Sequence, residues 1–154
     1  MASRKARGMT IIELMIALAI LAILASVAFP LYDRYVMRGY RSQAMADIQA
    51  CAMAMERFFT VNFTYVGAAD DGGGNPVANG PPLATTCRSF SPPNGNVRYN
   101  ITLAANADTF TATAAAVGSQ AADGNLALDA TGARFWDRND DGDYTDAGEQ
   151  GWNE

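Results

Sequence analysis

The chain begins with a long apolar run that follows a short basic segment. From Leu14 to Tyr32 nineteen consecutive residues carry no charge, which is about the length that an α-helix needs to cross a bilayer. Three cations, Arg4, Lys5 and Arg7, precede the run. By the positive-inside rule these cations stay in the cytoplasm and the rest of the chain is exported. The pattern therefore predicts a membrane-spanning helix near the N-terminus.

Beyond Tyr32 the pattern becomes that of an amphipathic helix. Apolar or small residues recur at steps of three and four, and charged residues fall largely between them. The apolar stripe consists of Met37, Tyr40, Ala44, Ile48, Cys51, Met55 and Phe58, and the charged positions are Arg34, Arg38, Arg41, Asp47, Glu56 and Arg57. One helix from about Met9 to Phe63 would be roughly 80 Å long at 1.5 Å per residue.

The remainder of the chain predicts a loop followed by strands. Residues 64–93 are dominated by Gly, Pro, Asn and Asp and show no sustained period, which is typical of a loop. Alternating apolar residues then predict a strand at 97–103, and further apolar residues with a turn at 130–132 predict strands at 109–117, 126–128 and 133–136. The chain is therefore expected to be an α+β protein. Its long N-terminal helix would pack on a small antiparallel sheet of three or four strands.

Charge and composition exclude several classes of function. The net charge is −5, and removal of Arg4, Lys5 and Arg7 makes it −8, so the exported part is a poor general binder of nucleic acid. There is no histidine, which is the commonest general base and transition-metal ligand. No catalytic motif is recognisable, and we do not expect an enzyme.

Cys51 and Cys87 are the only cysteines. In an exported chain an even pair predicts a disulfide. Closing the loop between them would stabilise the fold by roughly 3 to 4 kcal/mol in the chain-entropy model. Two free buried thiols are the alternative.

Glu13 is an unusual residue, because it places a carboxylate at the start of an apolar helix. Ionisable groups in membrane segments are costly and often functional. The alternative is that Glu13 lies at the membrane interface and only ends the apolar span.

The context of Glu13 resembles a known signal. Lys5-Ala6-Arg7-Gly8 followed by Met9-Thr10-Ile11-Ile12-Glu13-Leu14-Met15 closely resembles the class III signal of type IV pilins and pseudopilins. The resemblance implies that a prepilin peptidase cuts after Gly8 and methylates Met9, where the family usually has phenylalanine. It also implies that Glu13 pairs with the terminal amine of a neighbouring subunit during assembly.

This N-terminal region has two other interpretations. An ordinary secretory signal has a shorter apolar core followed by a small-residue cleavage site, for which residues 25–28 could be mistaken. A plain membrane anchor would not need the glycine and glutamate at this spacing.

The pilin resemblance implies an organisation and a function. Residues 1–8 would be the leader, 9–36 the membrane and filament-core helix, and 37–154 the globular head. The protein would wait in the bacterial inner membrane and then polymerise with its own copies or related pilins into an extracellular pilus for adhesion, motility or DNA uptake. A type II secretion pseudopilin and a minor DNA-uptake pilin are the alternatives, although DNA is an unexpected partner for so acidic a chain.

An acidic segment near the C-terminus resembles a calcium-binding loop. Oxygen ligands at loop positions 1, 3 and 5 with glycine at position 6 suit Ca²⁺. The candidate ligands are Asp137, Asn139, Asp141, Asp143, Asp146 and Glu149. The match is incomplete, because Gly148 occupies the position of the usual closing glutamate. A solvated acidic tail is the alternative.

Overall fold

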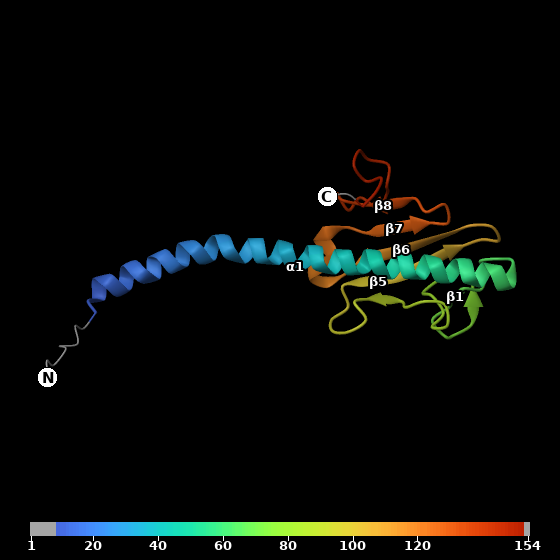
Figure 1. Ribbon diagram of the computed structural model, residues 1–154, viewed down its shortest axis with the longest axis horizontal. Coiled ribbons are helices and arrows are strands. Elements are labelled where there is room, and N and C mark those ends of the chain that lie inside the picture. The colour runs from blue at the N-terminus through green and yellow to red at the C-terminus, as the bar shows by residue number, and fades with distance from the viewer. Residues whose placement is uncertain (1–8, 153–154) are drawn as a thin grey trace, which may run out of the picture. The chain divides into compact units, whose positions relative to one another are not determined.

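A computed structural model describes residues 9–152 of the chain (Figure 1). The predicted leader, including Gly8, lies outside the described residues. The chain divides into two units between Val36 and Met37.

The helix α1 runs from Ile11 to Asn62, 52 residues, and contains Pro30. These bounds agree with the predicted helix from about Met9 to Phe63. At its C-terminal end the backbone N–H of Phe63 donates to the carbonyl of Phe59 over 2.8 Å. Within the second unit α1 buries a stripe of residues at helical spacing, which confirms the predicted amphipathic pattern. The stripe consists of Arg41, Ala44, Ile48, Cys51, Ala54 and Met55.

The main sheet is antiparallel and has the order β3-β5-β6-β7-β8, with β4 also paired to β5. The four longer strands lie at the predicted positions. They are β5 (Tyr99–Ala105), β6 (Phe110–Ala116), β7 (Leu126–Asp129) and β8 (Arg134–Trp136), and a 3₁₀ helix, η1 (Gly118–Asp123), joins β6 to β7. Burial alternates along β5 as predicted, whereas Leu126, Ala127 and Leu128 of β7 are all buried. The α+β prediction is thus confirmed.

The predicted loop at 64–93 contains four strands of two residues each. They are β1 (Ala69–Asp70), β2 (Pro76–Val77), β3 (Asn79–Gly80) and β4 (Phe90–Ser91). β1 and β2 form a separate small sheet, whereas β3 and β4 bring the main sheet to six strands rather than three or four. Such short segments show no alternation in the sequence. β3 and β4 form where the edge of β5 offers backbone partners, whereas β1 and β2 pair with each other.

The core lies between α1 and one face of the main sheet (Figure 1). Ile48 and Met55 of the helix contact a layer that includes Ile101, Phe110 and Leu126, all of them almost fully buried. The inward positions 112 and 114 of β6 are both alanine. Small residues there leave room for the helix to lie close to the centre of the sheet.

Candidate functional sites

The first turn of α1 is closed by a reciprocal pair of hydrogen bonds. The backbone N–H of Thr10 donates to Oε2 of Glu13 over 2.8 Å, and the backbone N–H of Glu13 donates to Oγ1 of Thr10 over 3.2 Å. This is a capping box, which satisfies N–H groups that lack partners in a first helical turn. The spacing Thr-x-x-Glu is the sequence signal of a capping box. From the sequence we assigned Glu13 a role in assembly and overlooked this second role as a helix cap.

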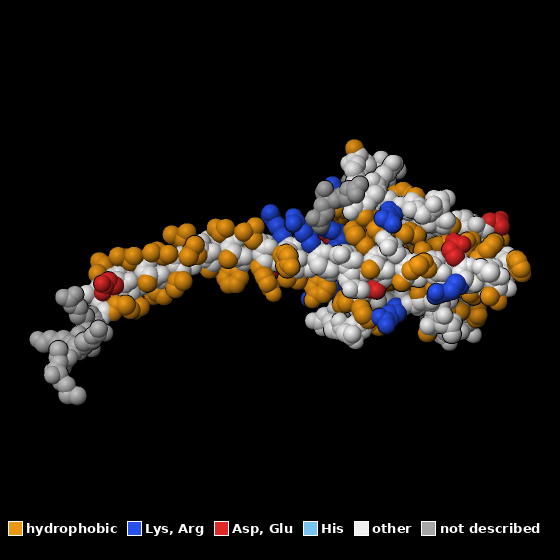
Figure 2. Space-filling view, in the orientation of Figure 1, with side chains coloured by type: hydrophobic (Ala, Val, Ile, Leu, Met, Phe, Trp, Pro, Cys, Tyr) orange, Lys and Arg blue, Asp and Glu red, His pale blue; other side chains and the backbone are white. Residues whose placement is uncertain are grey.

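The part of α1 that follows the cap exposes a continuous apolar surface, which is orange in Figure 2. The large apolar side chains from Met9 to Tyr35 that are exposed have accessible fractions of 47% to 81%. They are Met9, Ile11, Ile12, Leu14, Met15, Ile16, Leu18, Ile20, Leu21, Ile23, Leu24, Val27, Phe29, Leu31, Tyr32 and Tyr35. Among the described residues, α1 is the one helix long and apolar enough to span a membrane. A surface of this kind requires lipid or the apolar helices of other chains.

Arg41 departs from its predicted place among the exposed charges. Its side chain is buried and forms an ion pair of 2.6 Å with Oδ1 of Asp123, which ends η1. The guanidinium also lies 3.9 Å from the ring centre of Trp136, whose Nε1–H donates to the carbonyl of Asp123 over 2.7 Å. A buried charge needs such partners. They come from η1 and β8, which are distant from Arg41 in the sequence, so a local sequence pattern could not predict them.

The second oxygen of Asp123 completes this buried network. The hydroxyl of Tyr99 donates to Oδ2 over 2.7 Å, and Nε2 of Gln120 donates to the same atom over 2.8 Å. Gln120 also donates to the carbonyl of Met37 over 3.0 Å. Burial and the Asp123 carboxylate raise the pKa of Tyr99 well above its ordinary value, so the hydroxyl keeps the proton that it donates.

Cys51 and Cys87 form a disulfide with a Cα–Cα distance of 5.1 Å. The predicted bond is therefore present, and it joins the buried face of α1 to the segment between β3 and β4. The two cysteines are 36 residues apart. The bond therefore restrains a long loop in the unfolded chain.

Three carboxylates of the acidic segment come together. Asp137, Asp141 and Glu149 each offer one oxygen, and these oxygens lie within 4.8 Å of one another. Asp137 and Glu149 are buried, with exposed fractions of 0% and 2%, whereas Asp141 is exposed. Ca²⁺ binds oxygen at 2.3–2.6 Å, so oxygens at this mutual spacing can share one ion. The three carboxylates fit a hard divalent cation.

Backbone amides orient the two buried carboxylates. Asp137 accepts from the N–H groups of Asp141 and Gly142 over 3.2 and 3.1 Å. Glu149 accepts from the N–H groups of Arg138 and Asp146, each over 3.2 Å. The positive φ of Gly142, 89°, lets the chain turn beneath Asp137.

The other three predicted ligands lie outside this group of carboxylates. Asp143 accepts from the backbone N–H and the hydroxyl of Thr145 over 2.8 and 2.9 Å, and these bonds lower its pKa. The amide of Asn139 donates to Asp141 over 2.8 Å and to Asp146 over 2.9 Å. Asn139 and Asp146 therefore border the cluster, and Asp143 turns toward its own loop.

Charges in the cluster act on a neighbouring tyrosine. Burial, followed by the charges of Asp137 and Glu149, raises the pKa of Tyr144. Its ring lies against Phe135, with ring centres 5.5 Å apart. The segment after β8 thus contacts the strand through Tyr144, while residues 138–143 and 145–148 are exposed.

The segment is also anchored at both of its ends. The backbone N–H of Trp136 donates to the carbonyl of Glu149 over 2.8 Å, and Gly151 donates to the carbonyl of Arg134 over 2.6 Å. At Gly124 an added Cβ would stand 1.7 Å from the carbonyl oxygen of Asp137, so only glycine fits beneath this segment. The sequence pattern of Asp and Gly predicted the loop, but not the burial of Asp137 and Glu149 at its two ends.

Comparisons with known proteins place these features in a family. Residues 30–127 match the family described as type IV minor pilin ComP, DNA uptake sequence receptor. Residues 3–29 match the prokaryotic N-terminal methylation motif, which includes the predicted processing site at Gly8 and Met9.

Curated pilins match over part of the chain. The type IV major pilin protein PilA of Myxococcus xanthus is 37% identical over 65 residues, which are 42% of this chain and 30% of PilA. The type IV major fimbrial protein FimA of Dichelobacter nodosus and a fimbrial protein of Pseudomonas aeruginosa are each 42% identical over 50 residues, 32% of either chain. The chain thus matches about a third of the length of these relatives. The first family match covers most of the sequence, and the chain belongs to the type IV pilins.

Proposed function

We propose that this chain is a structural subunit of a type IV pilus. The observation that carries the proposal is the exposed apolar surface of α1 from Met9 to Tyr35. In the inner membrane this surface would face lipid, and in the filament it would face the same helix of other copies or related pilins. A prepilin peptidase would first remove residues 1–8 and methylate Met9. The proposal includes no catalytic activity.

A receptor for DNA is the second candidate function, because the matched family is described as a DNA uptake sequence receptor. Arg57 and Arg88 support it. Both are exposed, and with Thr86 they line one depression of about 250 Å³ beside the disulfide. Their guanidinium groups are suited to phosphate contacts. Against this candidate, Asp47 lines the same depression, and the chain carries a net charge of −5.

A deletion strain that carries no gene, the wild-type gene or a double arginine variant tests both candidates. We expect a strain that lacks the gene to lose surface filaments in electron micrographs, and the wild-type gene to restore them. In Arg57→Gln/Arg88→Gln cells, normal filaments with reduced DNA uptake would support the receptor function. Normal filaments on the deletion strain would contradict the role of a structural subunit.

We further propose that the cluster of Asp137, Asp141 and Glu149 binds Ca²⁺. Two of its carboxylates are buried close together, and their mutual repulsion opposes folding of the segment unless a positive charge offsets it. A divalent cation bound by all three would offset it directly. Asn139 and Asp146 border the cluster and could supply further oxygens after small side-chain rotations.

We expect Ca²⁺ to raise the melting temperature of the full-length protein in detergent. A ligand that binds only the folded state stabilises it by about 2.7 kcal/mol at a hundredfold excess over Kd. Mg²⁺ should do so less, because it demands shorter bonds and octahedral geometry. Calorimetry and the fluorescence of Trp136 and Trp152 would measure binding.

Matched substitutions in the same loop provide the control. Asp141→Asn removes an exposed member of the cluster and should abolish the shift in melting temperature. Asp143→Asn changes the same charge outside the cluster and should retain it. If millimolar Ca²⁺ produces neither heat nor a shift in the wild-type protein, the segment is not a calcium site.

A further inference from the structure

The sequence contains two Asn-Gly pairs, Asn79-Gly80 and Asn94-Gly95. In such a pair the backbone nitrogen of the glycine can attack the side-chain carbonyl carbon of the asparagine, because glycine has no Cβ to shield that nitrogen. Asparagine is accordingly one of the thermolabile residues. In a folded chain the attack requires both residues to move freely enough for the two atoms to meet.

The pair Asn94-Gly95 lies at the tip of the loop that joins β4 to β5. The backbone N–H of Arg98 donates to the carbonyl of Ser91 over 2.9 Å and closes this loop, and residues 94–97 are exposed. Gly95 has a φ of +91°, and an added Cβ there would meet nothing within 4 Å. Within the part of the chain that the structure describes, neither residue of the pair forms a hydrogen bond. Asn94 and Gly95 are therefore free to change conformation.

The pair Asn79-Gly80 is held in place, although Asn79 is exposed as well. Both residues belong to β3, which pairs with β5. Oδ1 of Asn79 accepts from the backbone N–H of Ala105 over 3.2 Å. An added Cβ at Gly80 would overlap the carbonyl oxygen of Asp70, so the glycine backbone packs directly against β1. The two reacting atoms of this pair can meet only after β3 opens.

We propose that Asn94 deamidates spontaneously in the folded protein and that the fold protects Asn79. The nitrogen of Gly95 forms a bond to Cγ of Asn94, and the bond from Cγ to Nδ2 breaks. Nδ2 takes the amide proton of Gly95 and leaves as ammonia, so that a five-membered succinimide remains. Water then opens the ring at either carbonyl and produces aspartate or isoaspartate. No oxidant, reductant or enzyme is needed.

The reaction changes the charge of one surface loop. Residues 92–97 contain no charged side chain, and the whole chain has a net charge of −5. Each deamidation adds one negative charge at position 94, so the head becomes more acidic as the protein ages. The reaction needs neither a partner nor a second copy, and it is therefore independent of the proposed pilus function.

Peptide mapping of the full-length protein in detergent, aged at neutral pH, tests the proposal. The fragment from Ser89 to Arg98 should gain one dalton, the difference between an amide and an acid. The fragment with Asn79 should gain it roughly tenfold more slowly or less, because β3 must first open. In the urea-unfolded chain the two sites should react at similar rates.

Three outcomes would overturn the proposal. Asn94 could stay intact in the folded protein, or Asn79 could react as fast as Asn94 there. A difference of the same size in the unfolded chain would assign it to local sequence and not to the fold.

Substitutions in the same loop locate the reaction. Isoelectric focusing of aged wild-type protein should show an acidic band at the position of fresh Asn94→Asp protein. Asn94→Gln should prevent this band, because glutamine would have to form a larger ring. Asn96→Gln is the matched control and should retain the band, since the branched side chain of Val97 shields the nitrogen that follows Asn96. An acidic band that persists in Asn94→Gln would place the modification elsewhere and contradict the proposal.

Discussion

Replacement of Asp123 by alanine should lower the free energy of unfolding of this pilin by roughly 3–5 kcal/mol, because it leaves a buried cation without its partner. The side chains of Arg41 and Asp123 are only 6% and 9% exposed. The substitution also removes the acceptor for Tyr99 and Gln120. Denaturant titration of the full-length protein in detergent would measure the loss.

Two further variants isolate the ion pair. Asp108→Ala removes the same charge from an exposed position and should change stability by less than about 0.5 kcal/mol. In the double variant Arg41→Met/Asp123→Leu no charge remains buried, so its loss should be smaller than the sum of the single losses. A cost below about 1 kcal/mol for Asp123→Ala would show that the network does not hold the head together.

The second large effect is expected at Glu13, where Glu13→Ala should reduce the number of filaments per cell by about tenfold or more. The proposed partner of Glu13 is the terminal amine of a neighbouring subunit in an apolar filament core. Without the carboxylate that amine is left as an unpaired charge. Electron microscopy, in cells without wild-type subunits, would provide the count.

Glu13→Gln distinguishes assembly from helix capping. Glutamine can still accept from the N–H of Thr10 and keep the capping box, but it has no charge. If Glu13 acts through its charge, the Gln variant should lose filaments as the Ala variant does, while membrane insertion stays normal. Wild-type filament numbers in the Gln variant would show that the charge of Glu13 is not needed for assembly and that Glu13 acts only as a helix cap.

The sequence predicted the elements whose signals are local. The steps of three and four from Met37 to Phe58 predicted the buried face of α1. Alternation predicted β5, and apolar residues near a turn predicted β6 to β8. The Asp and Gly pattern predicted a folded loop at 137–149. The strands within 64–93 were missed because two-residue pairings show no periodicity. Two of them, β3 and β4, depend on the edge of β5, and the other two, β1 and β2, pair with each other.

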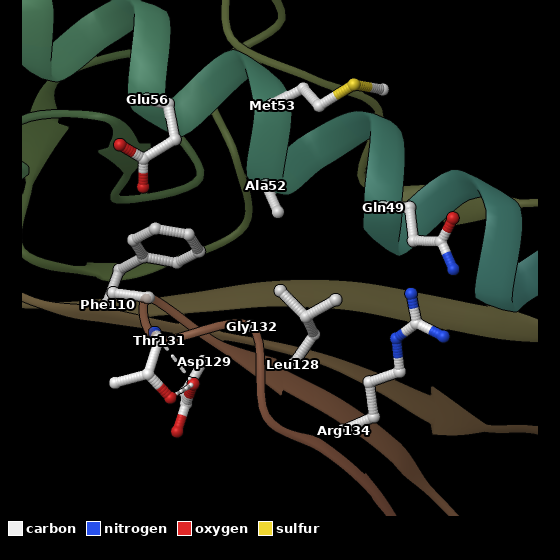
Figure 3. A pocket seen from close by; sticks show the side chains of 11 residues that line it. Gln49, Ala52, Met53, Glu56, Phe110, Leu128, Asp129, Thr131, Gly132 and Arg134 are labelled. Carbon is white, nitrogen blue, oxygen red and sulfur yellow. Dashed lines mark hydrogen bonds between the residues drawn. The ribbon is translucent and has the colours of Figure 1, made fainter. Parts of the chain in front are cut away.

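By itself, the sequence determined the helix, the four longer strands, the cysteine pair and the family, because periodicity, spacing and motif are properties of neighbouring residues. Only the tertiary structure decided which charges are buried. Arg41 and Asp123 are 82 residues apart, and Asp137 and Glu149 become buried where the final segment folds back on β8. A hollow of about 420 Å³, lined among others by Gln49 of α1 and Arg134 of β8 (Figure 3), likewise exists only where helix and sheet meet. These features depend on contacts between distant segments, and the pattern of neighbouring residues cannot predict such contacts.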